Sequence, residues 1–385
     1  MAELARRHRR RADTPPPKGS RRGGPQHAPG HRGRGARRPH RGEAAHQRRP
    51  TRTPPARPTP RSAERSSLGR GGPRAATRHL QSMSTSVAPP PLVHLGRSAG
   101  ATPSRPRHAA STRHEQRDVT VHGMRLRYID VAPSGHEDDE PILLIHGHSS
   151  RLEEYEALIP HLGARRRVLI PDLPGSGYSD KPDRAYDLAL FEDALLGFLD
   201  ALGVQRAHLG GGSLGGNLVL RLGHREPERF DRLAAWAPAG SWDPMRRWAI
   251  FGRVMKRLPF MFWPCLWVQS RFWYRRDWEG RDAALREVWA YYREVYGAGF
   301  HRMYWEIGVD QAEQSLFDRA PDIHHPTWLA YGDQDKALDM DRGVQRLATL
   351  LPRVKLRVFE GARHSLANEV PEELGREVDA FLAEP

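Results

Sequence analysis

A serine in a glycine-rich turn constrains the fold of this chain more than any other feature. Residues 209–219 read LGGGSLGGNLV and contain a G-x-S-x-G match centred on Ser213. A short apolar stretch, 204–209, precedes the serine, and a run with helical character, 214–222, follows it. A strand that turns sharply into a helix holds its serine in a strained backbone conformation where only small neighbours fit. The pattern favours Ser213 as a catalytic nucleophile, but it also occurs by chance in glycine-rich loops, so the other motifs decide.

The charge of the chain is unevenly distributed. The formal net charge is +15, yet residues 1–117 hold 27 Lys and Arg against 5 Asp and Glu, whereas residues 118–385 hold 34 against 41. The first segment is rich in Arg, Pro and Gly and has few large apolar side chains, so we predict that it is disordered. No nucleic-acid partner is expected for the acidic remainder.

Three interpretations of the segment 1–117 compete. It is a basic arm for nucleic acid or anionic surfaces, a targeting presequence, or translated upstream sequence with the true start at an internal methionine such as Met83. The third is favoured, because Arg, Pro, Gly and Ala dominate without a pattern.

Strands and helices alternate through most of the remaining chain. Residues 118–132 read as a β-hairpin, and the other predicted strands are 141–145, 167–170, 204–209, 232–236, 327–331 and 354–359. The predicted helices between and after them are 151–162, 188–202, 214–222, 342–351 and 371–382. This alternation predicts an α/β fold with a mostly parallel central sheet flanked by helices, formed by 118–239 and 321–385.

The alternation breaks over residues 240–320, which are dense in Trp, Phe, Tyr and Arg and read as helices without strands. We predict an inserted helical cap over an active site; a plain surface insertion is the alternative. The run 258–268 is too short to span a bilayer, so it packs the cap, lines a channel or dips into an interface. Trp242, Phe300 and Tyr304 are candidate wall residues, the last two on one helix face.

A serine hydroxyl needs a base within hydrogen-bond reach and a carboxylate to orient that base. Functional groups of parallel sheets lie at the carboxyl ends of strands. The loop GDQD follows one predicted strand and the loop EGARHS follows the next. We therefore predict His364 as general base and acid and Asp335 as its orienting carboxylate, with Asp333 as the competitor.

Acyl transfer also requires donors for the negative oxygen of the tetrahedral intermediate. The backbone N–H of Leu214, directly after the nucleophile, is one predicted donor. The backbone N–H of His148, in the loop after the strand 141–145, is the other; its imidazole is not assigned this role.

The remaining polar candidates are given structural roles. His324 and His325 precede a strand and lie at the wrong end of the sheet. Cys265 is the only cysteine, which excludes an internal disulfide and favours a reducing, cytoplasmic location. No run of 18 apolar residues and no secretory signal appears, so no transmembrane helix is predicted.

Five motifs together carry a resemblance to a known family. They are LLIHGHSS (143–150), DLPGSGYSD (172–180), GGGSLGG (210–216), YGDQD (331–335) and GARHSLANEVPEEL (361–374). In this order and at these separations, residues 118–385 resemble the α/β-hydrolase superfamily, in the serine-nucleophile branch with a helical cap. One departure is Gly212, where many members have histidine. A nucleophilic aspartate marks the haloalkane dehalogenases and epoxide hydrolases of this branch, and Ser213 argues against both.

The expected function is hydrolysis of a small-to-medium, fairly apolar carboxylic ester through an acyl-enzyme, with no metal or organic cofactor implied. A carbon–carbon bond hydrolase of the meta-cleavage-product type, acting on a vinylogous diketone, is an alternative that uses the same three residues. A non-catalytic binding protein that keeps the fold is a second alternative, from a different class.

Overall fold

The computed structural model describes residues 112–133 and 139–385. The three interpretations of the segment 1–117 therefore concern residues that, up to 111, lie outside the described part. The first strand, β1, begins at Gln116. The folded part thus starts two residues before the predicted boundary.

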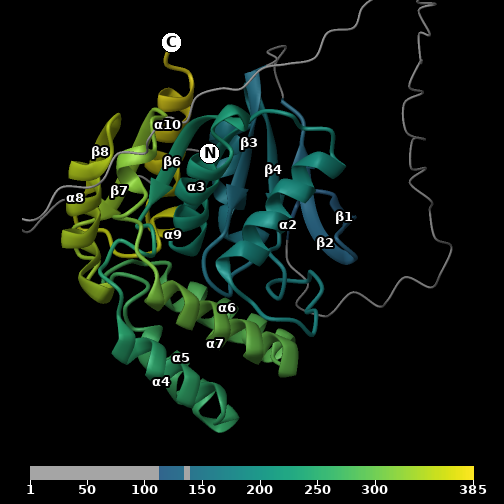
Figure 1. The fold of residues 1–385 in the computed structure, drawn as a ribbon, viewed down its shortest axis with the longest axis vertical. Helices are drawn as coiled ribbons and strands as arrows, with labels where there is room; N and C mark the ends of the chain where they lie inside the picture. Colours follow the sequence, from purple (N-terminus) through teal and green to yellow (C-terminus); the bar gives the residue numbers. More distant parts are fainter. Residues whose placement is uncertain (1–111, 134–138) are drawn as a thin grey trace, which may run out of the picture. The chain divides into compact units, whose positions relative to one another are not determined.

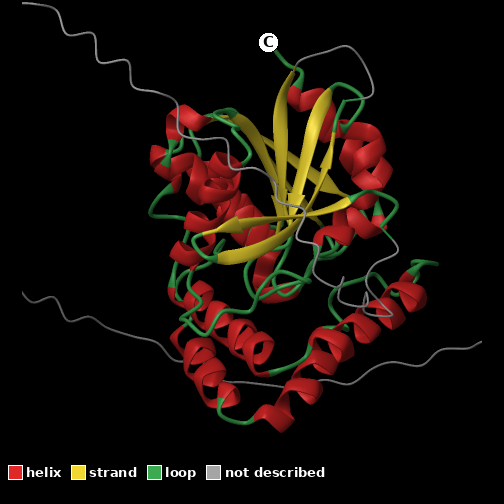
Figure 2. Cartoon of the chain, turned by 90° about the vertical axis from the view of Figure 1, so that its right-hand side faces the viewer, coloured by secondary structure: helices red, strands yellow, loops and turns green. Residues whose placement is uncertain are grey.

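Within the described residues, an eight-stranded sheet forms the centre of the molecule (Figure 2). Its strands are β1 (Gln116–Val121), β2 (Met124–Val131), β3 (Asp139–Ile145), β4 (Arg166–Pro171), β5 (Ala207–Gly212), β6 (Phe230–Trp236), β7 (Thr327–Gly332) and β8 (Val354–Phe359). Their order across the sheet is β1-β2-β4-β3-β5-β6-β7-β8. The pairs β1–β2 and β2–β4 are antiparallel, and every other pair is parallel. The predicted mostly parallel α/β sheet is confirmed.

Helices cover both faces of the sheet. One face carries α2 (Leu188–Ala201), α3 (Leu214–Arg225) and α8 (Met340–Leu350), and the other carries the 3-10 helix η1 (Leu152–Leu158) with α1 (Ile159–Leu162), α9 (Leu366–Glu369) and α10 (Pro371–Leu382). Alternate side chains of β3 enter the two cores: Leu143 and Ile145 the first, Ile142 and Leu144 the second. This double burial explains why the strand reads as a continuous apolar run.

The predicted helix 151–162 is divided in two. Residues Leu152–Leu158 form the 3-10 helix η1, and only Ile159–Leu162 are α-helical. Pro160 has no N–H to donate to the carbonyl of Glu156, four residues earlier, so an α-helical ladder cannot run through this position.

Residues 240–320 form a helical segment between β6 and β7, with no strand among them. Its elements are α4 (Arg246–Lys256), η3 (Pro259–Met261), α5 (Phe262–Gln269), α6 (Arg281–Val295), α7 (Ala298–Glu313) and η4 (Ala320–Asp322). Figure 1 shows α4 to α7 gathered at one end of the sheet, with α4 outermost. No helix of the described residues is long and apolar enough to cross a bilayer.

Candidate active site

Ser213 occupies a strained turn between β5 and α3. Its φ is +56° and its ψ is −119°, a region that L-residues seldom adopt. The turn closes only because its neighbours are glycines. A Cβ at Gly215 would lie 1.7 Å from the carbonyl oxygen of Ile145, and one at Gly211 would lie 2.7 Å from the carbonyl carbon of Gly215. The motif therefore folds as the sharp strand-to-helix turn that an exposed nucleophile requires.

The unusual Gly212 is matched by a tryptophan on the adjacent strand. A Cβ at Gly212 would lie 2.1 Å from Nε1 of Trp236, so the indole occupies the space of a side chain at this position. The ring of Tyr155 contacts Trp236 edge-on at a centroid distance of 5.4 Å. Its hydroxyl accepts a hydrogen bond from the Gly212 N–H (2.9 Å) and donates one to the Ile145 carbonyl (3.1 Å). Tyr155 and Trp236 thus fix the strand that ends at Ser213.

His364 and Asp335 meet in the loops after β8 and β7. Asp335 is fully buried, and its Oδ2 lies 2.7 Å from Nδ1 of His364. The other oxygen of Asp335 accepts a hydrogen bond from the Ala337 N–H at 3.0 Å. Asp333 instead accepts from the Gly361 N–H at 2.7 Å. Asp335, not Asp333, is the carboxylate that contacts His364.

The environment of His364 sets its pKa. Burial is the largest single effect and lowers the pKa of this imidazole. The charge and hydrogen bond of Asp335, together with the charges of Glu154 and Glu369, raise the pKa by more in total. The net pKa lies above the ordinary histidine value. Asp335 therefore makes His364 a better proton acceptor than a free imidazole.

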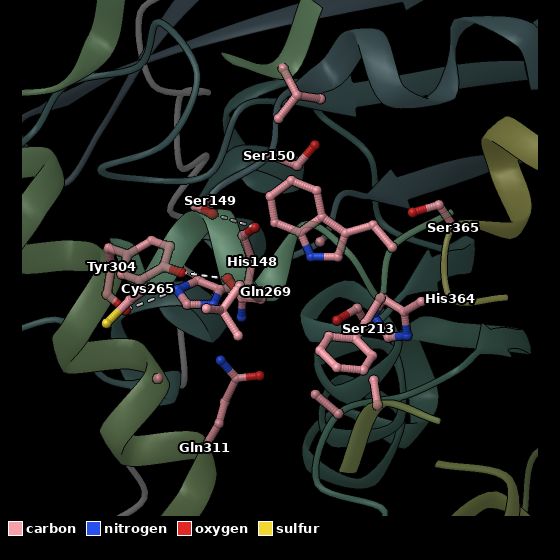
Figure 3. Close-up of a pocket in the computed structure, with 18 of the residues that line it drawn as sticks. His148, Ser149, Ser150, Ser213, Cys265, Gln269, Tyr304, Gln311, His364 and Ser365 are labelled. Carbon is pink, nitrogen blue, oxygen red and sulfur yellow. Dashed lines mark hydrogen bonds between the residues drawn. The ribbon is translucent and has the colours of Figure 1, made fainter. Parts of the chain in front are cut away.

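Ser213 and His364 line one cavity of about 900 Å³ (Figure 3). The loop after β3 borders the same point, because a Cβ at Gly147 would lie 3.6 Å from Cβ of Ser213. His148 follows Gly147 and also lines the cavity. Leu214 is the first residue of α3, so its N–H has no carbonyl partner within the helix. Both predicted oxyanion donors thus belong to segments that adjoin Ser213.

The imidazole of His148 supports the cavity wall. Its ring stacks on that of Tyr304 at a centroid distance of 4.7 Å, and its Nε2 lies 2.9 Å from the Tyr304 carbonyl oxygen (Figure 3). Burial lowers the pKa of His148 to about 4. The ring is therefore neutral at pH 7, with the Nε2 hydrogen donated to the carbonyl.

Two of the three predicted wall residues border the cavity. Trp242 and Tyr304 both line it. The Trp242 Nε1–H donates to the backbone carbonyl of Gln311 at 3.2 Å. The Tyr304 hydroxyl donates to the side chain of Gln269, another lining residue.

The prediction for Phe300 is wrong. Phe300 is fully buried and absent from the cavity wall; its ring packs 6.2 Å from that of Phe262 and 5.7 Å from that of Tyr292. The cavity follows α7 only from Tyr304 onward. Phe300 and Tyr304 lie on the same face of α7, but they have different surroundings. Phe300, in the first turn, packs in the core of the helical segment, whereas Tyr304, one turn later, lines the cavity.

Several charged lining residues were not predicted. Arg151 forms ion pairs with Glu153 and Glu287, and its guanidinium lies 4.5 Å from the ring centroid of Tyr291. Glu154 accepts a hydrogen bond from the Gly147 N–H at 3.3 Å. Arg151, Glu153 and Glu154 closely follow the LLIHGHSS motif, so their position after a strand could have marked them as site residues. Nothing in the sequence marks Glu287, which lies on α6.

The other lining cation is also paired. The Lys336 ammonium lies 3.1 Å from a carboxylate oxygen of Asp341 and donates to the Asp333 carbonyl. Arg151 and Lys336 are the lysine and arginine residues of the described chain that line the cavity. Neither is left with a free charge.

Two other groups of reactive side chains, a cysteine and a cluster of possible metal ligands, lie apart from the contact between His364 and Asp335. Cys265 lines the cavity, and burial raises the pKa of its thiol, so it stays protonated. Among the described residues, one cluster has side chains of metal-ligand type: Glu140, His208 and Asp231. They lie near the starts of β3, β5 and β6, at the opposite end of the sheet from Ser213, and Arg206 forms an ion pair with Glu140 at 2.9 Å.

Comparison with known proteins identifies the class of this chain. Residues 140–369 match the family described as "alpha/beta hydrolase fold". The chain therefore belongs to the α/β-hydrolase family and is a hydrolase of that fold. This finding confirms the family and the fold expected from the five sequence motifs.

Among individual proteins, the chain is similar to two 2-hydroxymuconate semialdehyde hydrolases. It is 29% identical over 261 residues to that of Pseudomonas sp. (strain CF600), covering 63% of this chain and 87% of the relative. It is 30% identical over 228 residues to that of Pseudomonas putida, covering 57% and 78%. Among solved structures it is similar to a bacterial membrane phospholipase A described as a virulence factor, with a TM-score of 0.56 and 27% identity, covering 70% of this chain and 86% of that one.

Proposed function

We propose that the protein is a serine hydrolase that cleaves an apolar carboxylic ester through an acyl-enzyme. Ser213 is the nucleophile, His364 the general base and acid, and Asp335 the carboxylate that orients His364. The strained backbone of Ser213, the 2.7 Å contact between His364 and Asp335 and the shared cavity support this assignment.

The steps follow from where these groups lie. His364 accepts the Ser213 hydroxyl proton through Nε2 as Oγ attacks the ester carbonyl carbon. The backbone N–H groups of Leu214 and His148 donate to the oxygen of the tetrahedral intermediate. His364 returns the proton to the leaving alkoxide, which departs as the alcohol and leaves an acyl ester on Ser213. Water then attacks that ester as it gives a proton to His364. His364 returns this proton to the departing Oγ, which releases the acid and restores the Ser213 hydroxyl.

The helical segment 240–320 acts as a cap in this scheme. It supplies Trp242, Trp248, Cys265, Tyr292 and Tyr304, among others, to the cavity wall. A mostly apolar cover over Ser213 excludes bulk water and strengthens the electrostatic interactions beneath it. The cap also selects for an acyl group that is itself apolar.

One observation carries the choice of an uncharged substrate. Arg151 and Lys336, the lining cations among the described residues, already have carboxylate partners. A substrate carboxylate brought into this cavity would lose its hydration without gaining a cation that is free to pair. A neutral ester has no such cost.

The second candidate is a carbon–carbon bond hydrolase of the meta-cleavage-product type. The two relatives that are about 30% identical favour it, and both are named for 2-hydroxymuconate semialdehyde, a carboxylate. The same three residues serve that chemistry. Because both lining cations already have carboxylate partners, we rank the carbon–carbon hydrolase below the ester hydrolase.

Steady-state kinetics with both substrate classes separates the candidates. The purified chain is assayed with p-nitrophenyl acetate, butyrate and octanoate and with 2-hydroxymuconate semialdehyde. Ser213→Ala is the inactive variant, and Ser365→Ala, which changes another lining serine, is the matched control. We expect a higher kcat/KM on an ester, lost in Ser213→Ala and kept in Ser365→Ala. A higher kcat/KM on the semialdehyde would replace the ester proposal by the second candidate.

A further inference from the structure

The helical segment exposes an unusual number of large apolar side chains. Nine are exposed in the described chain, and eight of them lie between residues 248 and 272. These eight form the apolar patch: Trp248, Ile250, Phe251, Val254, Phe260, Trp267, Val268 and Phe272. Phe260 is 70% exposed and Ile250 59%. Exposed apolar groups gathered on one segment mark a surface that binds something.

The same segment is strongly basic. Residues 244–276 contain eight Lys and Arg and no Asp or Glu, although residues 118–385 as a whole are net acidic. Arg253 and Lys256 pair with glutamates of α7. Five exposed arginines have no carboxylate within ion-pairing distance among the described residues, and they form the cationic rim: Arg246, Arg247, Arg257, Arg271 and Arg276.

Helix α4 presents both kinds of side chain outward. Ala249, Gly252 and Met255 face inward, and a Cβ at Gly252 would lie 2.7 Å from Val309 of α7. Ile250 is exposed on the opposite side of α4, where the i, i+4 spacing also places Arg246 and Val254. Figure 1 shows this helix at the outer edge of the molecule.

The apolar patch is continuous with the interior of the cavity. Trp248, Phe251, Val268 and Phe272 are exposed at the surface and also line the cavity that contains Ser213. An apolar path therefore leads from the patch to the candidate active site.

We propose that this face, the apolar patch with its cationic rim, binds peripherally to an anionic lipid bilayer. Aromatic side chains partition into the bilayer interface, and arginines outside an apolar patch pair with anionic headgroups. The binding does not depend on the proposed ester chemistry. A lipid-soluble molecule in the bilayer would meet the four patch residues that also line the cavity.

Charge argues for a lipid surface rather than a second copy of the chain. In a two-fold dimer the same patch contacts itself, so the five rim arginines of one copy would face the five of the other. An anionic bilayer neutralises these charges instead. Its surface also accepts aromatic rings without requiring a complementary shape.

Fluorescence quenching tests the proposal on the full chain. All ten tryptophans lie after residue 117, so quenching does not report the basic segment 1–117. Vesicles contain equal parts of phosphatidylcholine and phosphatidylglycerol, with or without bromine on the acyl chains. We expect brominated vesicles to quench the fluorescence, and Trp267→Phe to remove a large part of that quenching. Binding without quenching would mean that another segment tethers the chain, and would overturn the proposal.

Patch variants complete the test by co-sedimentation with the same vesicles. The double variant Ile250→Ser with Phe260→Ser should lower the bound fraction by about tenfold or more, because two exposed apolar groups no longer enter the interface. Leu356→Ser, which changes the ninth exposed apolar residue, on β8, is the matched control and should bind like wild type. Equal binding by the double variant, equal binding to vesicles of phosphatidylcholine alone, or a dimer that the double variant abolishes would each overturn the proposal.

Discussion

Asp335 acts on His364 through one hydrogen bond of 2.7 Å and a charge held out of water. Both effects orient the imidazole, with Nδ1 toward the carboxylate and Nε2 free to receive a proton. Asp333, two residues away in the same loop, serves a backbone amide instead. Asp335 and Asp333 can therefore be compared directly by the same substitution.

Asp335→Asn removes the charge but keeps the size of the side chain. We expect kcat to fall by about 10,000-fold, because an amide does not stabilise the imidazolium or hold the correct tautomer. Asp333→Asn keeps an oxygen acceptor for the Gly361 N–H and should stay within about threefold of wild type. Equal losses in the two variants would mean that Asp335 has no special role.

The pKa of His364 predicts the pH profile. The imidazole accepts a proton only when neutral, and Asp335 holds its pKa above the ordinary value of about 6.5. The kcat/KM should therefore fall as the pH drops through a midpoint above about 6.5. In Asp335→Asn the opposing effect of burial remains, so the midpoint of the residual activity should move to lower pH. A midpoint that does not move would exclude His364 as the titrating group.

Gly212 and Trp236 form a second pair that can be tested by substitution. Gly212→Ala places a methyl group against the indole and should lower the free energy of unfolding by about 1–3 kcal/mol. Trp236→Phe in the same chain should recover part of the loss, measured by urea denaturation. Gly297→Ala is the control, because nothing lies within 4 Å of its Cβ position. A double variant less stable than the sum of the two single changes would rule out this packing explanation.

At the scale of elements, the order of strands and helices was predictable because apolar periodicity and turn residues encode it locally. The strand before Ser213 was predicted at 204–209 but runs from Ala207 to Gly212. Three glycines carry no β-preference; they form strand here because they pair with β3 and β6. A side chain at any of them would meet β3, α3 or Trp236 of β6. The contact between Asp335 and His364 was foreseeable from strand ends. The burial of Phe300 was not, because periodicity gives a helix face but not its partner.

Glu369 joins the helical segment 240–320 to the loop of His364. Its two oxygens accept the N–H of Arg275 (2.8 Å) and of Arg363 (3.0 Å). The Ser365 N–H also donates to the Trp273 carbonyl at 3.1 Å. The position of His364 therefore depends on the loop between α5 and α6, about 90 residues earlier in the chain.

Removing this connection should affect both stability and rate. Glu369→Ala leaves two backbone donors without their acceptor, at about 1–3 kcal/mol each, and should lower kcat by about 10- to 100-fold through displacement of His364. Glu373→Ala, which removes an exposed ion pair with Arg357, is the control and should change neither. Unchanged kcat in folded Glu369→Ala would show that the loop of His364 holds its position without this link to the helical segment.

At the scale of the whole molecule, distant segments converge on one cavity: the turn at Ser213, the loops after β3, β7 and β8, and the helical segment 240–320. The sheet brings the turn and the three loops together because its parallel strands end at one edge. The helical segment covers that edge and carries the exposed apolar patch on its outer side. The sequence did not predict which residues line the cavity or which side chains of α4 are exposed, because both depend on how the helices pack against one another.

Labelling with a fluorophosphonate probe tests the nucleophile most directly. The tryptic peptide 207–221 contains Ser213 as its single serine, so mass spectrometry locates the adduct without ambiguity. We predict one adduct per chain on this peptide in wild type and in Ser365→Ala, and none in Ser213→Ala. Slower labelling is expected in Asp335→Asn. An adduct on any other peptide, or no adduct in folded wild-type protein, would contradict the assignment of Ser213.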